Sequence, residues 1–558
     1  MKNKIKNKVI LLLGVVFLTL TACDDFLEYS ESDTLSEELA YNNLERATQV
    51  GFNCYTFLRD NFGSAMRSSA CDESQYVWSE SYIHRYYNGS WSQFNPVDDM
   101  WGHYYKGIYM CNNFLEKGAD KEFEEYRYNE DYERLYANFK NVKWEVRALR
   151  AYFYFELAKR YGNVPLITKT LSEEEANNIS QTGAKDVLTW IAGECQTCYE
   201  YLPDSYDSSV FLKQLGRVTK LFVKSLEARA LLYAASPLHN NGSYDLEILR
   251  SSGKASLDVI NTMESAGVRL ANINYFDLWN SDADTHAKCV EIISMIRRGN
   301  SNGFERDNFP ISVEGGKTGN CPTQNLVDAY DMQSGFTYDP ANPYANRDQR
   351  LQQTIVVNQS EWAYNETMDI FYGGKDGLPN KGATPTGYYL KKYAMKNTNL
   401  NPVGTTSHKK VWILFRLGEV YLNYAEAASQ INGVSGTDAD LTMSAVDAIN
   451  KVRGRKGLTI DPLPGDLSLQ DFTAKYRKER MVELAFEDHR FWDIRRWMIG
   501  STSVVLKTMK IEKAADGSIS YTKEIDNISR KWEDKYYFYP ISVNELNINT
   551  NLKQNKGW

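Results

Sequence analysis

Apolar positions recur at helical spacing through most of the first half of the chain. Within Ser36–Asp60 they fall on one face of a helix, at Leu39, Leu44, Ala47 and Val50. The strongest pattern covers Tyr132–Tyr161, where Gly162 and Pro165 follow as stop signals. The same spacing predicts further helices at Asp98–Gly118, Asp186–Leu202 and Thr219–Ala235.

The pattern changes in the second half. Asn272–Thr406 is rich in Gly, Asn, Pro, Asp and Tyr, and only Val290–Ile296 within it is predicted as a short strand. Loop regions of this length inside compact proteins are usually functional. Helical periodicity returns at Val411, and the spacing of Leu414, Leu417, Gly418 and Tyr421 fits the first helix of a tetratricopeptide repeat, with Ser444–Arg455 as its partner. The intervening loop is longer than a regular repeat allows, so the unit is repeat-like.

Glu479–Trp497 has the densest pattern in the chain. It contains no Gly or Pro, and its charge runs from acidic to basic, which suits the dipole of a helix. Val482, Ala485, Phe486 and Ile494 lie near one apolar face. The run is therefore predicted to form one long, partly buried helix whose charges pair with one another.

The N-terminus has the features of a lipoprotein leader. Four lysines between positions 2 and 8 precede a short apolar stretch, Val9–Leu20, that is too short to span a membrane. Leu20-Thr21-Ala22-Cys23 then resembles a lipobox, in which Cys23 is acylated and anchors the chain. The alternative is an ordinary signal peptide with an incidental cysteine.

Charge and motif content argue against several other functions. Loss of residues 1–22 changes the formal net charge from −8 to −12, which disfavours nucleic acid as a partner. Gly299-x-Ser301-x-Gly303 lacks the following helix of a nucleophile elbow, and Gly315–Thr318 lacks the first glycine of a phosphate-binding loop. No residue spacing indicates a metal site, and Cys195 and Cys198 are interpreted as structural. No enzyme activity and no cofactor are therefore expected, although a carboxylate pair distant in sequence stays an open alternative.

The candidate binding residues belong to two loops. Ala70–Pro96 combines flat aromatic rings with hydrogen-bonding groups, as recognition of neutral sugars requires, in Trp78, Tyr82, Arg85, Tyr86, Asn88 and Trp91. Arg297–Asn308 is the second segment, and Arg297, Arg298, Asn300 and Phe304 are predicted to face the first loop across a shallow site. The alternatives are that the aromatic residues plug the loop onto the scaffold, and that the second segment is a turn or a contact with a transporter.

Several motifs in order resemble the RagB/SusD family of glycan-binding outer-membrane lipoproteins. They are Ala148–Leu166, Pro322–Met332, Asn346–Leu351, Glu479–Trp497 and the C-terminal Tyr539-Pro540-Ile541. The resemblance implies a mostly α fold: a tetratricopeptide-repeat-like superhelix of four helix pairs with a loop-rich, irregular second half and few short strands. It divides the chain into a signal peptide (1–22), an N-terminal helical region (23–270) and a C-terminal region (271–558).

The resemblance also implies a function. The protein would lie on the outer membrane, lipid-anchored and facing the cell exterior, as the acidic Asp24 and Asp25 after Cys23 suggest. It would capture an oligosaccharide without catalysis and pass it to a SusC-like TonB-dependent transporter. The alternative is a lid for peptide or another nutrient, or a helical scaffold that contacts only the transporter.

Overall fold

Helices dominate the fold, which the computed structural model describes for residues 37–206, 214–279, 289–526 and 528–558. Cys23 and the predicted leader lie outside these residues. In the N-terminal half the helices are α2 (Glu37–Tyr41), α3 (Leu44–Asn53), α4 (Arg85–Asn88), α5 (Trp101–Lys117), α6 (Tyr132–Tyr161), α7 (Glu173–Asn177), α8 (Ala184–Tyr199), α9 (Lys220–Ala235) and α10 (Leu246–Ser265). In the C-terminal half they are α12 (Gly303–Asn308), α13 (Gln324–Ala329), α14 (Gln349–Thr354), α15 (Leu417–Asn432), α16 (Ala445–Arg453), α17 (Leu469–Glu483), α18 (Arg490–Arg496) and α19 (Val543–Ile548).

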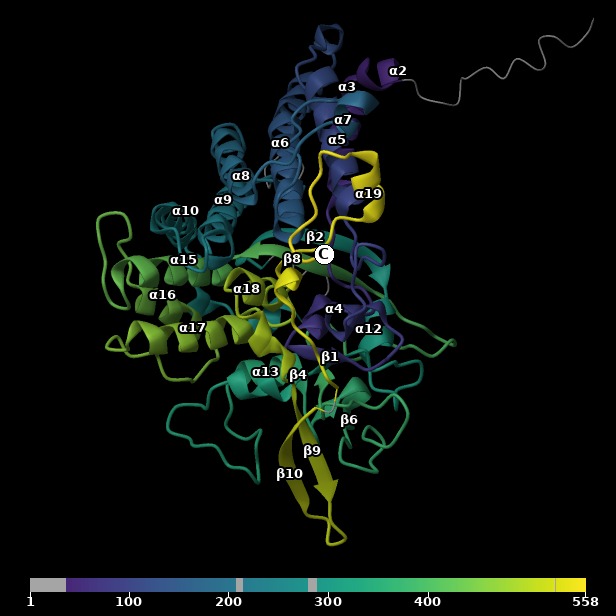
Figure 1. The fold of residues 1–558 in the computed structure, drawn as a ribbon, viewed down its shortest axis with the longest axis vertical. Helices are drawn as coiled ribbons and strands as arrows, with labels where there is room; N and C mark the ends of the chain where they lie inside the picture. Colours follow the sequence, from purple (N-terminus) through teal and green to yellow (C-terminus); the bar gives the residue numbers. More distant parts are fainter. Residues whose placement is uncertain (1–36, 207–213, 280–288, 527) are drawn as a thin grey trace, which may run out of the picture.

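The long helices pack in four successive pairs. α5 packs on α6, α8 on α9, α10 on α15, and α16 on α17, while α6–α8, α9–α10 and α15–α16 contacts join one pair to the next (Figure 1). This arrangement confirms the mostly α, repeat-like fold that the periodicity and the resemblance predicted. The third pair takes α10 from before residue 270 and α15 from after it, so the helix array is continuous across the predicted boundary, which stays a prediction.

Local sequence explains where these helices begin and end. Thr219 and Asp245 accept hydrogen bonds from the first turns of α9 and α10, and Ser444 does so for α16. α6 ends at Gly162, whose positive φ of 68° is a conformation that glycine adopts without strain. The predicted helix at Ser36–Asp60 is instead divided into α2, α3 and a short 3₁₀ turn, Cys54–Phe57.

The strands are short and pair two by two, always antiparallel. The pairs are β1 (Ser74–Tyr76) with β3 (Asn320–Pro322), β2 (Ile292–Ser301) with β8 (His408–Arg416), β4 (Ile355–Val356) with β7 (Tyr389–Leu390), β5 (Glu361–Trp362) with β6 (Glu366–Thr367), and β9 (Lys507–Lys513) with β10 (Ile519–Ile525). The β2–β8 ribbon crosses the middle of the molecule, between the tall helices and the loop-rich lower half (Figure 1).

Three further predictions of secondary structure are wrong. A short helix, α12, does follow Gly299-x-Ser301-x-Gly303, where none was predicted. Val411–Arg416 belongs to β8 and not to a repeat helix, which begins only at Leu417. Its run of apolar residues is buried because β8 lies against the helices, and a fully buried strand shows no alternation. Glu479–Trp497 is also not one helix: α17 ends at Glu483 and α18 begins at Arg490.

Tertiary contacts hold the turn between α17 and α18. Phe486 and Asp488 have positive φ values of 60° and 65°, which non-glycine residues adopt rarely. The Phe486 backbone N–H donates to Oε1 of Glu73 at 2.6 Å, and Asp488 accepts from Arg67 at 2.6 Å. Burial raises the pKa of Glu73 to about 8. These partners are remote in sequence, so the turn leaves no local signal.

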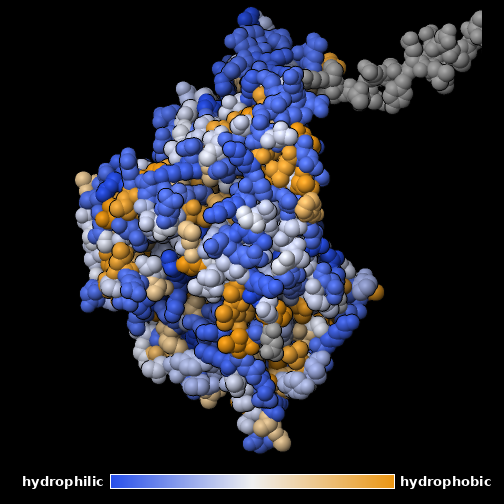
Figure 2. All heavy atoms as spheres, viewed as in Figure 1, coloured by the Kyte–Doolittle hydropathy of each residue, from blue (hydrophilic) through white to orange (hydrophobic). Residues whose placement is uncertain are grey.

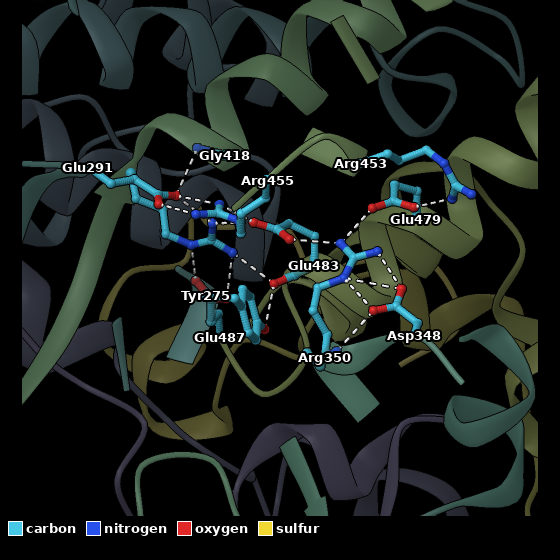
Figure 3. Close-up of polar contacts among 12 residues, drawn as sticks. Tyr275, Glu291, Asp348, Arg350, Gly418, Arg453, Arg455, Glu479, Glu483 and Glu487 are labelled. Atoms are coloured by element: carbon cyan, nitrogen blue, oxygen red, sulfur yellow. Dashed lines mark hydrogen bonds and ion pairs between the residues drawn. The ribbon is translucent and has the colours of Figure 1, made fainter. Parts of the chain in front are cut away.

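The charges of α17 enter a buried ionic network (Figure 3). Arg350 donates to Glu479 at 2.6 Å and to Glu483 at 2.8 Å, and both carboxylates come from one face of α17. Arg416, at the end of β8, donates to Glu483 at 2.7 Å, and Arg455 does so at 2.6 Å. The predicted pairing within the run is therefore wrong for Glu479 and Glu483, because their partners come from β8, α14 and the segment after α16. The network joins the helix array to the loop-rich half.

Candidate ligand-binding site

The aromatic loop Ala70–Pro96 is more deeply packed than predicted. Trp91 is only 2% exposed and stacks on Tyr536, with ring centroids 5.6 Å apart. Tyr86 is 3% exposed, meets the edge of Trp91 and shares a hydrogen bond of 2.7 Å with the hydroxyl of Tyr539. Neither ring offers a face to a ligand, so the prediction that they stack on sugar is wrong. They fasten the loop onto the C-terminal segment.

Trp78 and Tyr82 lie nearer the surface. The half-buried Trp78 donates its Nε1–H to the carbonyl of Lys317 at 2.8 Å, and its ring covers Gly382. Tyr82 is 44% exposed, and its hydroxyl donates to the carbonyl of Ala65 at 3.1 Å. Tyr82 is thus an exposed ring whose position is fixed by a hydrogen bond, and its contact with a ligand stays a prediction.

The polar candidates of the same loop bond within it. Arg85 donates to Asn95 at 2.8 Å, and Asn88 accepts from the backbone N–H of Ser90 at 2.9 Å. Asn88 is exposed and Arg85 is half-buried. Both residues shape the loop, and neither lines one of the described cavities.

A hollow of about 560 Å³ lies at the second predicted segment, and we call it the Asp60 hollow. No residue of Ala70–Pro96 lines it, so the two predicted segments do not face each other across this hollow. Four elements surround it: the segment after the 3₁₀ turn Cys54–Phe57, the end of β2, α12, and the start of β8. The side chains that line it and carry the argument below are Asp60, Phe62, Arg298, Asn300, Arg306 and Asp307.

An irregularity in β2 shapes one wall of the hollow. Arg298 pairs with Lys410 and Ser301 with His408, so three steps along β2 match two along β8. The extra residue is a β-bulge, which bends a strand and redirects its side chains. Asn300 lies in this bulge and lines the hollow, whereas Arg297, which precedes the bulge, does not. Of the second predicted segment, Arg298, Asn300 and Phe304 therefore line this site.

Phe62 provides an aromatic surface in the hollow. It is half-buried, and its ring meets those of Phe304, Tyr393 and Trp412 edge to face, with centroid separations of 5.3, 5.0 and 5.0 Å. Three such contacts hold the ring in one orientation. A rigid, half-buried aromatic ring in the lining of an open hollow suits stacking against the C–H face of a sugar.

Ionic contacts fix the polar groups around Phe62. Arg298 donates through Nε to the carboxylate of Asp60, which also accepts from the backbone N–H of Phe62 at 3.0 Å. Lys410, which also lines the hollow, pairs with the buried Glu305. Burial lowers the pKa of Lys410, and the neighbouring Glu305 carboxylate opposes that shift. The hollow is therefore a preformed polar surface around one ring.

The chemistry of the hollow favours binding. Both carboxylates are engaged with arginines: Asp60 is held in an ion pair with Arg298, and Asp307 lies 3.5 Å from Arg306. Among the described residues no group of His, Cys, Asp and Glu side chains could hold a metal ion. No helix in the described part of the chain is long and apolar enough to cross a membrane.

Two other cavities are distinct in character. One, of about 380 Å³, adjoins the hollow at Asp60 and is lined by paired charges such as Arg67 and Asp488. There Lys159 lies 4.7 Å from the ring centroid of Trp492, and burial lowers its pKa to about 8. The other is a groove of about 280 Å³ between α5 and α19, where Figure 2 shows an apolar patch.

Sequence reasoning missed Asp60, Phe62, Arg306 and Asp307. Asp60 is the last residue of the first predicted helix and Phe62 follows it closely, and nothing in the local pattern there distinguishes a site residue from a helix end. Arg306 and Asp307 lay inside the predicted second segment but were not singled out. The hollow forms because β2 brings α12 beside residues 60–63, a contact between segments more than two hundred positions apart.

Comparisons with known proteins agree with this architecture. A model of the SusD family matches residues 291–558, and a model described as starch-binding and associating with the outer membrane matches residues 25–232. SusD-like protein P25 of Formosa agariphila is 23% identical over an alignment of 535 positions that covers 89% of this chain and 90% of the relative.

Solved structures show the same fold. A SusD-like protein from Bacteroides fragilis superposes with a TM-score of 0.77 at 25% identity, covering 94% of this chain and 99% of the other. A SusD-like carbohydrate binding protein from the same species has a TM-score of 0.72 at 24% identity, covering 92% and 99%. The matches cover both halves of the chain and its whole fold, and the chain belongs to the SusD/RagB family.

Proposed function

We propose that this protein binds an oligosaccharide or polysaccharide at the Asp60 hollow and does not alter it chemically. The observation that carries the proposal is the fixed ring of Phe62, surrounded by the amide of Asn300 and by guanidinium groups, in a member of the SusD/RagB family. Flat rings that stack on sugars, with side chains that bind hydroxyl groups, are what glycan recognition requires. A related solved structure is itself named as carbohydrate binding.

The N-terminal sequence and the family support a proposal for the location of this protein in the cell. One matching family model is described as associating with the outer membrane. We infer that Cys23 carries a lipid anchor, that the chain faces the cell exterior, and that it delivers its ligand to a SusC-like TonB-dependent transporter. Replacing Cys23 with alanine should release the protein from the membrane fraction; unchanged partitioning of Cys23→Ala would contradict the anchor.

A panel of polysaccharides in native affinity gels tests the binding proposal. The mature chain, residues 24–558, should be retarded by at least one of them. Asn300→Ala removes an exposed amide from the hollow and should weaken that retardation about threefold to tenfold, since a net hydrogen bond is worth about 1 kcal/mol. Asn129→Ala, at an exposed asparagine far from the hollow, is the matched control and should bind like the wild type.

The results separate this proposal from its rival. The burial of Trp91 and Tyr86 favours, to that extent, a helical scaffold that contacts only a transporter, or a lid for peptide or another nutrient. If no polysaccharide in a broad panel retards the protein, the glycan proposal is wrong and the rival gains. If retardation occurs and is equal in Asn300→Ala and Asn129→Ala, the glycan binds elsewhere.

A further inference from the structure

In the Asp60 hollow the side chains of Arg298 and Arg306 are more exposed than the carboxylates that they contact. The side chain of Arg298 is 43% exposed, whereas that of its partner Asp60 is 12% exposed. Likewise the side chain of Arg306 is 50% exposed and that of Asp307 is 17% exposed. The more exposed charged groups of these two pairs are therefore cations, although the mature chain is strongly acidic overall.

Both guanidinium groups have unused hydrogen-bond donors. Arg298 donates to Asp60 through Nε alone, and Nε of Arg306 lies 3.5 Å from Asp307. The terminal amino groups of these two arginines make no hydrogen bond with any residue that the structure describes. A guanidinium group of this kind binds a planar or tetrahedral anion through two parallel N–H bonds.

The two arginines flank Asn300 in the chain. Arg298 precedes the bulge, and Arg306 lies one turn into α12. The Nη2 atom of Arg306 lies 3.6 Å from the position that a Cβ on Gly303 would take, directly beside the end of the bulge. Phe62 lies in the same hollow. The hollow is thus lined by two guanidinium groups and one aromatic ring.

A third cation extends this surface. Arg59 is exposed, precedes Asp60 in the chain, and lines the adjoining cavity. Its Nε lies 3.2 Å from Nε2 of His103, and it forms no ion pair with a carboxylate of the described residues. The positive surface therefore continues past Asp60.

We propose that the glycan bound at this hollow is anionic, and that Arg298 and Arg306 receive its carboxylate or sulfate groups. This inference rests on the proposed function and specifies the class of its ligand. In such a complex a sugar ring stacks on Phe62, its hydroxyl groups reach Asn300, and acidic substituents on that sugar or its neighbours bind the two guanidinium groups.

Binding of the mature chain to charged and neutral polysaccharides tests this inference. The anionic probes are polygalacturonate, which carries carboxylates, and dextran sulfate; amylose and unmodified dextran are the neutral probes. We expect binding to at least one anionic probe, weakened about tenfold or more when the salt concentration rises from 50 to 500 mM, because ionic contacts at a surface are screened. Retention on polygalacturonate alone indicates carboxylates, and retention on dextran sulfate alone indicates sulfates.

Matched variants distinguish the hollow from general attraction to a polyanion. Arg306→Gln should weaken anionic binding at least fivefold. Arg127→Gln is its control, because Arg127 is 54% exposed and lies 3.5 Å from a nearby glutamate, as Arg306 does from Asp307. Arg250→Gln serves in the same way for Arg298→Gln. Equal losses in a variant and its control would overturn the inference.

The outcomes also separate this inference from the proposed function. If a neutral polysaccharide binds and neither Arg298→Gln nor Arg306→Gln weakens it, the glycan function stands and the anionic ligand is wrong. If neither charged nor neutral polysaccharide binds, the proposed function fails together with the inference.

Discussion

Arg416 offers the sharpest test of what the buried ionic network contributes to stability. It is 1% exposed and lies within 2.7–2.9 Å of the carboxylates of Glu291, Glu483 and Glu487. Replacing Arg416 with methionine keeps most of the side-chain volume and removes the charge. The variant therefore tests the ionic contacts and leaves almost no cavity.

The expected cost is large because three buried carboxylates lose a shared cation. Breaking a buried ion pair by removing one partner typically costs about 3–5 kcal/mol, since the remaining charge is uncompensated. Arg250→Met is the control: its pair with Asp438 is at the surface, with a side chain 37% exposed, and such pairs contribute about 1 kcal/mol or less. The two variants should therefore differ by at least about 2 kcal/mol in their free energy of unfolding.

Urea unfolding followed by tryptophan fluorescence measures the difference. We expect the midpoint of Arg416→Met to fall by on the order of 1 M, and that of Arg250→Met to stay close to the wild type. If the two midpoints agree, the network does not stabilise the fold through Arg416, and the reasoning above is refuted.

The pH dependence of the stability difference between Arg416→Met and the wild type provides a second, independent test. Burial alone would raise the pKa of Glu483, but Arg455, Arg416 and Arg350 together hold that pKa well below its ordinary value. Without Arg416, a surplus buried carboxylate binds a proton more tightly in the folded than in the unfolded state. Lowering the pH from 8 to 5 should therefore narrow the stability gap between Arg416→Met and the wild type. A gap that widens would contradict this account.

Three further predictions concern other buried groups: a glycine beside Arg416, a carboxylate, and the cysteines. Gly418→Ala would place a Cβ against Nη1 of Arg416, so its melting temperature should fall, whereas Gly102→Ala, with open space at its Cβ, should not fall; equal melting would refute the close packing. Burial alone would raise the pKa of Glu426, but Arg496 and its neighbours lower it to about 2. The stability that this ionised carboxylate contributes in the wild type should therefore be lost as the pH falls from about 4.5 to 2. In Glu426→Gln this part of the pH dependence of stability should be absent. If the variant loses stability over the same pH range as the wild type, Glu426 does not cause that loss. A thiol reagent should label no more than Cys289 in the native chain 24–558, because the other described cysteines are buried and free; rapid labelling of several thiols would contradict the fold.

Helices whose boundaries are set by local chemistry could be predicted from the sequence. α6 was placed at its exact limits because its apolar spacing is long and Gly162 follows it. α16 lies within its predicted range, with Ser444 as the N-cap. In both cases the signal lies in residues next to each other in the chain, and no distant contact overrides it.

Elements set by distant contacts could not be predicted. The β8 strand was misread as a helix because a buried strand and a buried helix are both continuously apolar over a short run. The turn between α17 and α18 depends on Glu73 and Arg67, which lie about four hundred positions away. No Gly or Pro marks that turn.

The residues of the candidate site also divide into those with a local sequence signal and those whose role depends on distant contacts. Asn300 was predicted and lines the hollow, because the loop-rich segment around it was recognisable by composition. Trp91 was predicted as a stacking ring and is buried, since composition cannot tell an aromatic plug from an aromatic platform. Phe62 was missed for the complementary reason: its role comes from Phe304, Tyr393 and Trp412, which are brought to it by the fold.

A crystal structure of the mature chain with an oligosaccharide from the polysaccharide that it binds would test the central claim most directly. The account predicts a sugar ring on Phe62, with polar contacts to Asn300 and to the guanidinium groups of Arg298 and Arg306. A sugar bound instead in the groove between α5 and α19, with an empty Asp60 hollow, would contradict it.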